Sequence, residues 1–174
     1  TASSTSGTGI DIGSGSLTIK GGSVTASSTS GTGIKSNSLT IEDGSVKASS
    51  VSSSPTNDHG EKVYCCTIEN PENANVTIKT GTGSSVWNGK PVNHSSLDPD
   101  DTNLYVWLPK LESNSTNSYL IILDPENSSE SRTRNYSFDT VTNTFKAAQV
   151  VNDFIFKSPV NPIYDGQPKE ASLE

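Results

Sequence analysis

This chain of 174 residues has few of the side chains that fill the interior of an ordinary globular protein. Only 30% of its residues are apolar and 18% are charged, against usual values of roughly 45–50% and about 25%. Such a low apolar content can indicate disorder, but disordered chains usually combine it with high net charge and no hydrophobic periodicity. Here the net charge is −7, and apolar residues alternate clearly along much of the chain. We therefore expect a folded, β-rich protein with a polar surface.

Two further absences limit the partners that we expect. Lys and Arg are outnumbered by Asp and Glu and form no cluster, which argues against nucleic acid and anionic membranes as partners. No run of about 20 apolar residues occurs, so the sequence predicts no membrane-spanning segment. The chain begins inside a repeat and shows no signal peptide, from which we expect it to be a fragment of a longer protein.

The two cysteines, Cys65 and Cys66, are adjacent, which is not the pattern of a disulfide-rich scaffold. A ring between neighbouring cysteines is strained and uncommon, and there is no Cys-x-x-Cys motif or nearby His to suggest a metal site. Because neighbouring residues of a strand point to opposite faces, we expect one thiol to be buried and the other half-exposed.

What the sequence has in abundance is Ser, Thr and Gly, arranged in a repeat. TASSTSGTGIDIGSGSLTIKGGSV opens the chain at residue 1, and the near copy TASSTSGTGIKSNSLTIEDGSV opens at residue 25. Each copy holds three short stretches whose apolar residues are two apart, as on one face of a strand, with Gly-rich and Ser-rich turns between them. The alignment matches Ile10 with Ile34, Leu17 with Leu39, Ile19 with Ile41, Val24 with Val46 and Ala26 with Ala48.

Three short strands in a period of roughly two dozen residues are typical of one coil of a parallel β-solenoid. Successive coils stack at about 4.8 Å, so matched residues lie over one another and small apolar side chains line a narrow interior. A stable solenoid needs roughly three coils. Residues 47–68 are a candidate third coil, with VYCCTI as its strand; otherwise the later part of the chain must cap the stack.

The stretch GTGIKSNSLTIEDGSVKAS resembles repeats of the type GxGIxSxGSLTIxGGTVTA, which occur in surface proteins of gut and soil bacteria. Some of those repeats belong to right-handed β-helices described as carbohydrate-binding. The resemblance covers about residues 1–50 and implies the fold and an extracellular or cell-surface location more strongly than a ligand. The family's acidic cation ligands cannot be placed here, because the acids of these coils lie at turns or outward positions: Asp11, Glu42 and Asp43.

From Val63 onward the fixed period is lost, and aromatic residues and prolines appear. Short strand candidates separated by polar turns favour an antiparallel β-sandwich. DPDDTNLYVWLPK resembles the D-x-D-G-x-L-Y-L-W-L-P segment of small transthyretin-like or Ig-like modules, which implies a β-sandwich in series with other modules and no catalysis. The strand candidates are 63–68, 75–80, 103–109, 118–123, 135–140 and 143–148.

The predicted architecture is therefore all-β. We expect a short right-handed parallel β-helix over residues 1–55 that is capped or followed by an antiparallel β-sandwich over 60–150. The tail over 151–174, which contains YDGQPK, resembles the start of a repeated surface module marked by Y-D-G-x-x-K. We expect this tail to be a linker or the beginning of that module, so neighbouring modules of the same chain are expected partners.

Oxygen-bearing side chains cluster just before the strand expected at 103–109. Ca²⁺ prefers several carboxylate and amide oxygens at 2.3–2.6 Å, so this cluster is a candidate weak calcium site and the only cofactor site that we expect. The spacing of an EF-hand is absent, and the alternative is an acidic turn that leads into the strand. The members of the cluster are Asp98, Asp100, Asp101 and Asn103.

Aromatic residues provide a second candidate site. Alternation along NLYVWLP sends its aliphatic residues to one face and Tyr105 and Trp107 to the other. If that face is open, the two rings form a platform of the kind on which sugars stack. The alternative is that a neighbouring strand or the tail covers them. Trp87, in the turn-like segment SSVWNGK, either anchors its loop or offers another aromatic contact.

We do not expect an enzyme, because His59 and His94 lie in polar loops and no nucleophile, base or carboxylate pair in a cleft can be assigned. Our leading hypothesis is a non-catalytic structural or adhesive module of a bacterial surface or secreted protein. The first alternative is a carbohydrate-binding module that takes a polysaccharide, or a host or cell-wall glycan, through the exposed aromatic residues. The second is a degenerate polysaccharide-active β-helix enzyme.

Overall fold

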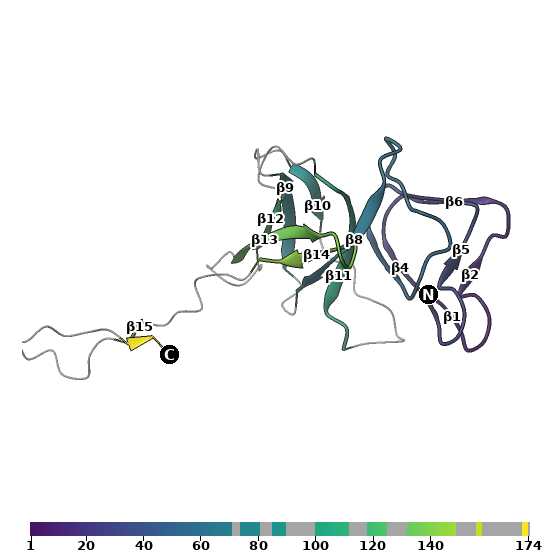
Figure 1. The fold of residues 1–174 in the computed structure, drawn as a ribbon, viewed down its shortest axis with the longest axis horizontal. Coiled ribbons are helices and arrows are strands. Elements are labelled where there is room, and N and C mark those ends of the chain that lie inside the picture. Colours follow the sequence, from purple (N-terminus) through teal and green to yellow (C-terminus); the bar gives the residue numbers. More distant parts are fainter. Residues whose placement is uncertain are drawn as a thin grey trace, which may run out of the picture.

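The structure, a computed structural model, describes residues 1–70, 74–80, 85–89, 100–111, 118–124, 132–148, 156–157 and 172–173. Every regular element in this part of the chain is a β-strand, which confirms the all-β prediction. In the same ranges, no helix is long and apolar enough to span a membrane. Figure 1 shows two parts side by side, which we call the repeat region (residues 1–62) and the sheet region (residues 63–148).

The repeat region consists of seven short strands that pair in parallel. They form one three-stranded ladder, β1-β4-β7, and two two-stranded ladders, β2-β5 and β3-β6. Each ladder therefore joins equivalent stretches of successive copies. The strands are β1 (Ala2–Ser4), β2 (Ile10–Asp11), β3 (Ser16–Ile19), β4 (Ser23–Ser28), β5 (Ile34–Lys35), β6 (Ser38–Ile41) and β7 (Ser45–Ala48).

The register of these ladders confirms the pairing that the repeat predicts. Ile10 lies beside Ile34, and the other matched pairs follow in the same way: Leu17 with Leu39, Ile19 with Ile41, Val24 with Val46 and Ala26 with Ala48. Their side chains form one apolar cluster. Because each apolar residue packs on its own counterpart, a chain with little apolar content still builds a continuous core.

Backbone also approaches backbone closely at a corner of the stack. Gly22 and Gly44 occupy this corner in the two copies, with positive φ angles of 77° and 93°. A Cβ atom on Gly44 would lie 2.5 Å from the carbonyl oxygen of Gly22, whereas one on Gly22 would meet nothing within 4 Å. The Ser45 N–H donates a hydrogen bond to that same Gly22 oxygen over 2.8 Å. The second copy therefore requires glycine here because the first copy lies directly against it.

A third copy begins but is not completed. Val51 forms a parallel bridge with Ile34, and Thr56 forms one with Thr40. VYCCTI then leaves the repeat, since it lies in β8 (Val63–Glu69) and pairs antiparallel with β11 (Asn103–Pro109). The candidate third coil over 47–68 is therefore wrong in its second half, and the later part of the chain caps the stack, with β11 beside β7.

The sheet region is one curled, hydrogen-bonded sheet of seven strands, where the sequence predicts the two packed sheets of a sandwich. Its order is β10-β9-β12-β13-β14-β8-β11, and all neighbours are antiparallel except β14 and β8. Those two strands meet through a single parallel pair, Phe145 with Cys66. The remaining strands are β9 (Asn75–Thr80), β10 (Ser85–Gly89), β12 (Ser118–Asp124), β13 (Arg132–Asp139) and β14 (Thr144–Ala147).

The curled sheet encloses one apolar core. Burial alternates strictly along β11 and β12, and the buried residues of β9, β11 and β12 belong to a single cluster with Cys66 and Ile68 of β8. Cys66 points into this core and Cys65 is half-exposed, as expected for adjacent strand residues. Burial raises the pKa of the Cys65 thiol to about 11 and raises that of Cys66 as well, so both thiols stay protonated at neutral pH.

The sequence locates most of these strands, with one clear error. The strand candidates 135–140 and 143–148 form a hairpin, because Phe138 pairs with Phe145 across the turn between β13 and β14. SSVWNGK, however, is not a turn: Ser85–Gly89 form β10, which pairs with β9. In the tail, β15 (Phe156–Lys157) and β16 (Ser172–Leu173) form a separate two-stranded sheet, and the rest of 151–174 lies outside the described residues.

Candidate functional site at the junction of the two regions

The outer edge of β7 is the place where the repeat and sheet regions meet. β7 is the last strand of its ladder, and a strand edge without a partner exposes backbone donors and acceptors. β11 supplies partners there. The Trp107 Nε1–H donates to the Val46 carbonyl oxygen over 2.9 Å, and the Tyr105 backbone N–H donates to Ser45 Oγ over 3.0 Å. Trp107 also packs against the apolar cluster of the repeat region, so β11 caps the stack with both polar and apolar contacts.

An ion pair crosses the same junction. Lys47 of β7 donates to Asp101 Oδ2 over 2.5 Å, and the Asp101 side chain is only 4% exposed. The Tyr105 hydroxyl donates to the same oxygen over 3.0 Å, and the Asn103 backbone N–H donates to Oδ1 over 3.0 Å. The Lys47 ammonium also lies 5.5 Å from the centre of the Tyr105 ring. The carboxylate thus has a cation and two hydrogen-bond donors, which compensate for its removal from water.

The surroundings of Asp101 fix its charge. Burial alone raises the pKa of this carboxyl, but the hydrogen bonds from Lys47, Asn103 and Tyr105 and the positive charge of Lys47 outweigh burial and lower the pKa to about 2. The pKa of the Tyr105 hydroxyl is raised, first by its own burial and then by its hydrogen bond to the Asp101 carboxylate. At neutral pH the junction therefore contains a carboxylate, an ammonium and a neutral phenol.

Of the three aromatic side chains that the sequence indicates as a binding site, the structure describes two. Tyr105 and Trp107 do lie on the face opposite the aliphatic residues of β11, but this face is not an open platform at these positions, because β7 covers it and leaves both rings half-buried. The alternative of a covering strand is the one that the structure shows. Trp87 lies in β10, and its side chain is outside the described part of the structure. Sugar binding by these three residues remains a prediction.

Three of the four candidate calcium ligands lie in the described part of the structure. Asp101 is engaged by Lys47, so a metal ion would have to displace an ammonium group, while Asp100 is exposed. Asn103 contributes its backbone N–H to Asp101, and Asp98 lies outside the described residues. Over the part of the chain that the structure describes, no three His, Cys, Asp or Glu side chains are grouped so as to hold a metal. A calcium role for this segment remains a prediction.

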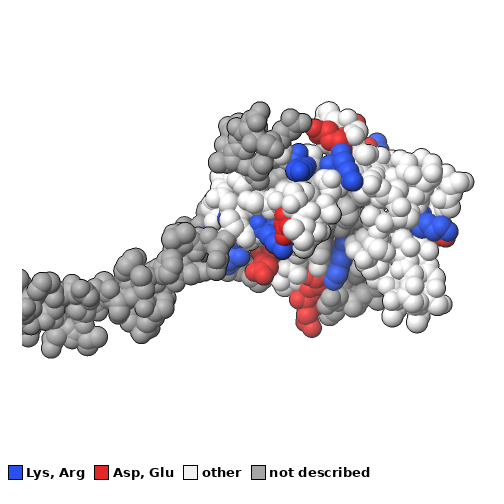
Figure 2. Space-filling view, in the orientation of Figure 1, with Lys and Arg blue, Asp and Glu red and all other residues white. Residues whose placement is uncertain are grey.

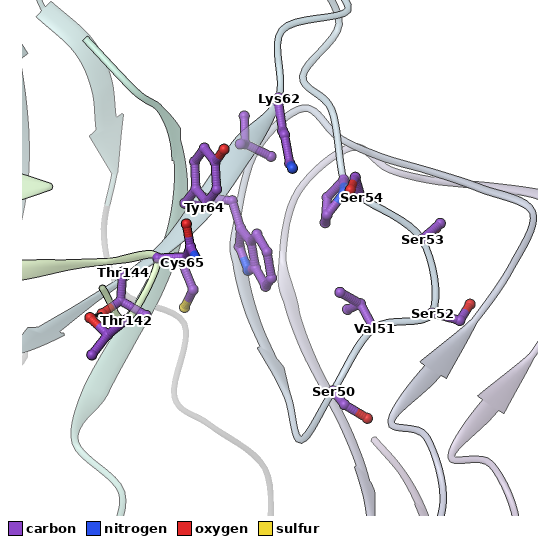
Figure 3. A pocket seen from close by; sticks show the side chains of 14 residues that line it. Ser50, Val51, Ser52, Ser53, Ser54, Lys62, Tyr64, Cys65, Thr142 and Thr144 are labelled. Atoms are coloured by element: carbon purple, nitrogen blue, oxygen red, sulfur yellow. Dashed lines mark hydrogen bonds between the residues drawn. The ribbon is translucent and has the colours of Figure 1, made fainter. Parts of the chain in front are cut away.

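Beside the junction lies an open groove of about 540 Å³. Figure 3 shows residues 50–54 on one side of it and the start of β8 with the turn before β14 on the other. Trp107 also lines the groove. Lys62 points into the space between Tyr64 and Ser54 (Figure 3). Lys62 is the one charged side chain among the described residues that line the groove.

Sequence reasoning missed Lys47 and Lys62, although the repeat contains a signal for the first. In the β4–β7 ladder Lys47 pairs with Thr25, so a long cation in the second copy replaces a small hydroxyl in the first. A substitution of that kind in an otherwise close repeat indicates a contact that only one copy makes. Lys62 follows the repeat in an irregular segment, where no periodicity marks it.

Comparison of the chain with protein-family models, with curated proteins and with solved structures finds no match in any of the three.

Proposed function

We propose that this chain is a non-catalytic structural or adhesive module of a bacterial surface or secreted protein. In this proposal the repeat region is a short right-handed parallel β-solenoid, and the curled sheet region is a module placed in series with it. The tail leads into a further module. The role of the module is to hold a binding part of the protein at a distance from the cell and so to display it.

The observation that carries the proposal is the junction itself. A spacer transmits position only if its parts do not bend freely against each other, and small polar interfaces between domains usually permit such motion. Here the contact combines an ion pair at Asp101, an indole hydrogen bond to Val46 and packing of Trp107 against the repeat cluster. These contacts join β7 to β11 and to the residues just before β11, and together they resist rotation about the connection.

The surface of the repeat region agrees with an exterior location. Its outward positions are mostly Ser and Thr, which remain hydrated at little cost, and Figure 2 shows that this end of the molecule has few charged side chains on the face in view. Ion pairs between successive copies, Lys35 with Asp11 and Lys20 with Glu42, are exposed and contribute little to stability. The resemblance of the repeats to those of bacterial surface proteins supports the same location.

The test is whether the two regions tumble as one body. We expect ¹⁵N relaxation to give a single rotational correlation time for amides of the repeat region and of the sheet region. In Trp107→Ala, which removes the indole contact, the two correlation times should separate. Val141→Ala is the control, because this residue is 88% exposed at the tip of the β13–β14 hairpin.

Two separate correlation times in the unmodified chain would overturn the role as a rigid spacer. Location is tested independently, since antibodies against the chain should label intact, unpermeabilised cells of the source organism or its culture medium.

A further inference from the structure

The groove beside the junction offers a combination of groups that the structural role does not use. We propose that it binds a glycan chain that carries carboxylate groups, with one sugar ring placed on Trp107 and a carboxylate at Lys62. The groove volume of about 540 Å³ lies within the range of roughly 300–1,000 Å³ that is typical of ligand sites, and such sites occur preferentially where two units of a protein meet.

Trp107 provides an aromatic surface whose orientation is already fixed. Its Nε1–H is held by the Val46 carbonyl oxygen, and the ring is half-buried against the repeat cluster while it also lines the groove. A sugar has an apolar face of C–H groups that packs on such a ring, and a ring that does not reorient loses little entropy when a ligand binds. The structural contact of the indole therefore prepares its remaining surface for stacking.

The charge of the groove selects an anionic ligand. The net charge of the chain is −7, but no Asp or Glu is among the described residues that line this groove. The Lys62 ammonium lies 5.5 Å from the centre of the Tyr64 ring and points into the open space. A carboxylate on the ligand would meet a single positive charge there, and a charge-assisted hydrogen bond of this kind is about twice as strong as a neutral one.

The rim of the groove favours a polyhydroxylated chain over an aromatic acid. Ser54, Thr142 and Thr144 contribute hydroxyl groups, and the hydroxyls of Thr142 and Thr144 are 2.9 Å apart. Hydroxyl groups act both as donors and as acceptors, as the hydroxyls of a sugar do. The groove is also open rather than enclosed, which suits one stretch of a longer chain better than a small molecule that must be enclosed.

The experiment uses the full chain with Trp87→Phe. The chain has two tryptophans, and this variant keeps only Trp107. Its fluorescence and the heat of binding are followed during titration with oligogalacturonate and with alginate oligomers, both of which carry a carboxylate on every sugar. Fully methyl-esterified oligogalacturonate is the matched neutral ligand. We expect the free acids to change Trp107 emission and to bind at least about tenfold more tightly than the ester.

Two lysine variants separate the site from general charge effects. Lys62→Gln should weaken binding of the acids by about tenfold and leave binding of the ester unchanged. Lys20→Gln, which removes an exposed lysine from the repeat region, should have no effect. The proposal is overturned if neither acid changes the emission, if acid and ester bind equally, or if both lysine variants lose affinity to the same extent. None of these outcomes depends on whether the two regions tumble as one body.

Discussion

Replacement of glycine by alanine at one corner of the stack tests the pairing of the two copies directly. In Gly44→Ala the new Cβ would lie 2.5 Å from the Gly22 carbonyl oxygen and 2.7 Å from the Gly21 carbonyl carbon. Both are backbone atoms, so no side chain can rotate away to relieve the contact. Gly22→Ala is the matched control, because Gly22 has a similar φ of 77° and a Cβ there would have no neighbour within 4 Å.

The difference between the two variants isolates the effect of stacking. Each alanine must adopt a positive φ, which costs about 1–2 kcal/mol at either position. Overpacking against fixed backbone adds about 1–3 kcal/mol at Gly44 alone. We therefore expect Gly44→Ala to lower the free energy of unfolding by about 2–5 kcal/mol and Gly22→Ala by about 1–2 kcal/mol.

Equilibrium urea unfolding measures these losses. Circular dichroism follows the strands of the whole chain. In a Trp87→Phe background, Trp107 emission reports on the end of the stack, because this indole packs against the repeat cluster. Equal losses in the two variants would refute the reasoning, since they would show that the first copy does not lie against Gly44 in solution. A changed slope of the transition would instead show that the two regions unfold separately.

Two further predictions concern titratable groups. The pKa of Asp101 is lowered from 3.8 to about 2 in the folded chain. Its ionised form therefore adds about 2 kcal/mol to the free energy of unfolding above pH 4, and this contribution is lost as the pH falls from about 4 to about 2. Urea unfolding at pH 5 and pH 2.5 should therefore show a larger acid-induced loss in the unmodified chain than in Asp101→Asn; identical losses would contradict the ion pair with Lys47. For the cysteines, burial raises the pKa of Cys65 to about 11 and also raises that of Cys66, so iodoacetamide at pH 8 should leave both thiols of the folded chain unmodified and label both in urea. Rapid labelling of Cys65 without denaturant would contradict the raised pKa of its thiol.

The dependence of the two regions on each other has a physical cause. Two complete copies and the start of a third give a short stack, and repeat structures gain stability mainly from contacts between neighbouring repeats. The last copy has no following copy, so its edge needs another cover. β11 provides it through the Trp107 indole N–H, which donates to the Val46 carbonyl oxygen, and through the Tyr105 backbone N–H, which donates to Ser45 Oγ. We expect the repeat region to lose much of its stability when it is separated from the sheet region.

The amino-acid sequence alone determined the repeat, its register and most strands of the sheet region. This was possible because the register of stacked copies is a local property: a residue packs on its own counterpart, so Ile10 and Ile34 can be paired by alignment. The alternation in NLYVWLP likewise fixes which side chains of β11 face the core, whatever the neighbouring strands are.

Only the tertiary structure decided what lies against the other face of β11 and where the repeat stops. The pairs Lys47 with Asp101 and Val46 with Trp107 join residues far apart in the sequence, and no periodicity relates them. VYCCTI suits a coil of the stack or a strand of the curled sheet equally well by its pattern, and the seven-residue pairing of β8 with β11 decides for the sheet. The groove follows from that choice, because Lys62, Tyr64 and Trp107 meet only once β8 has left the stack.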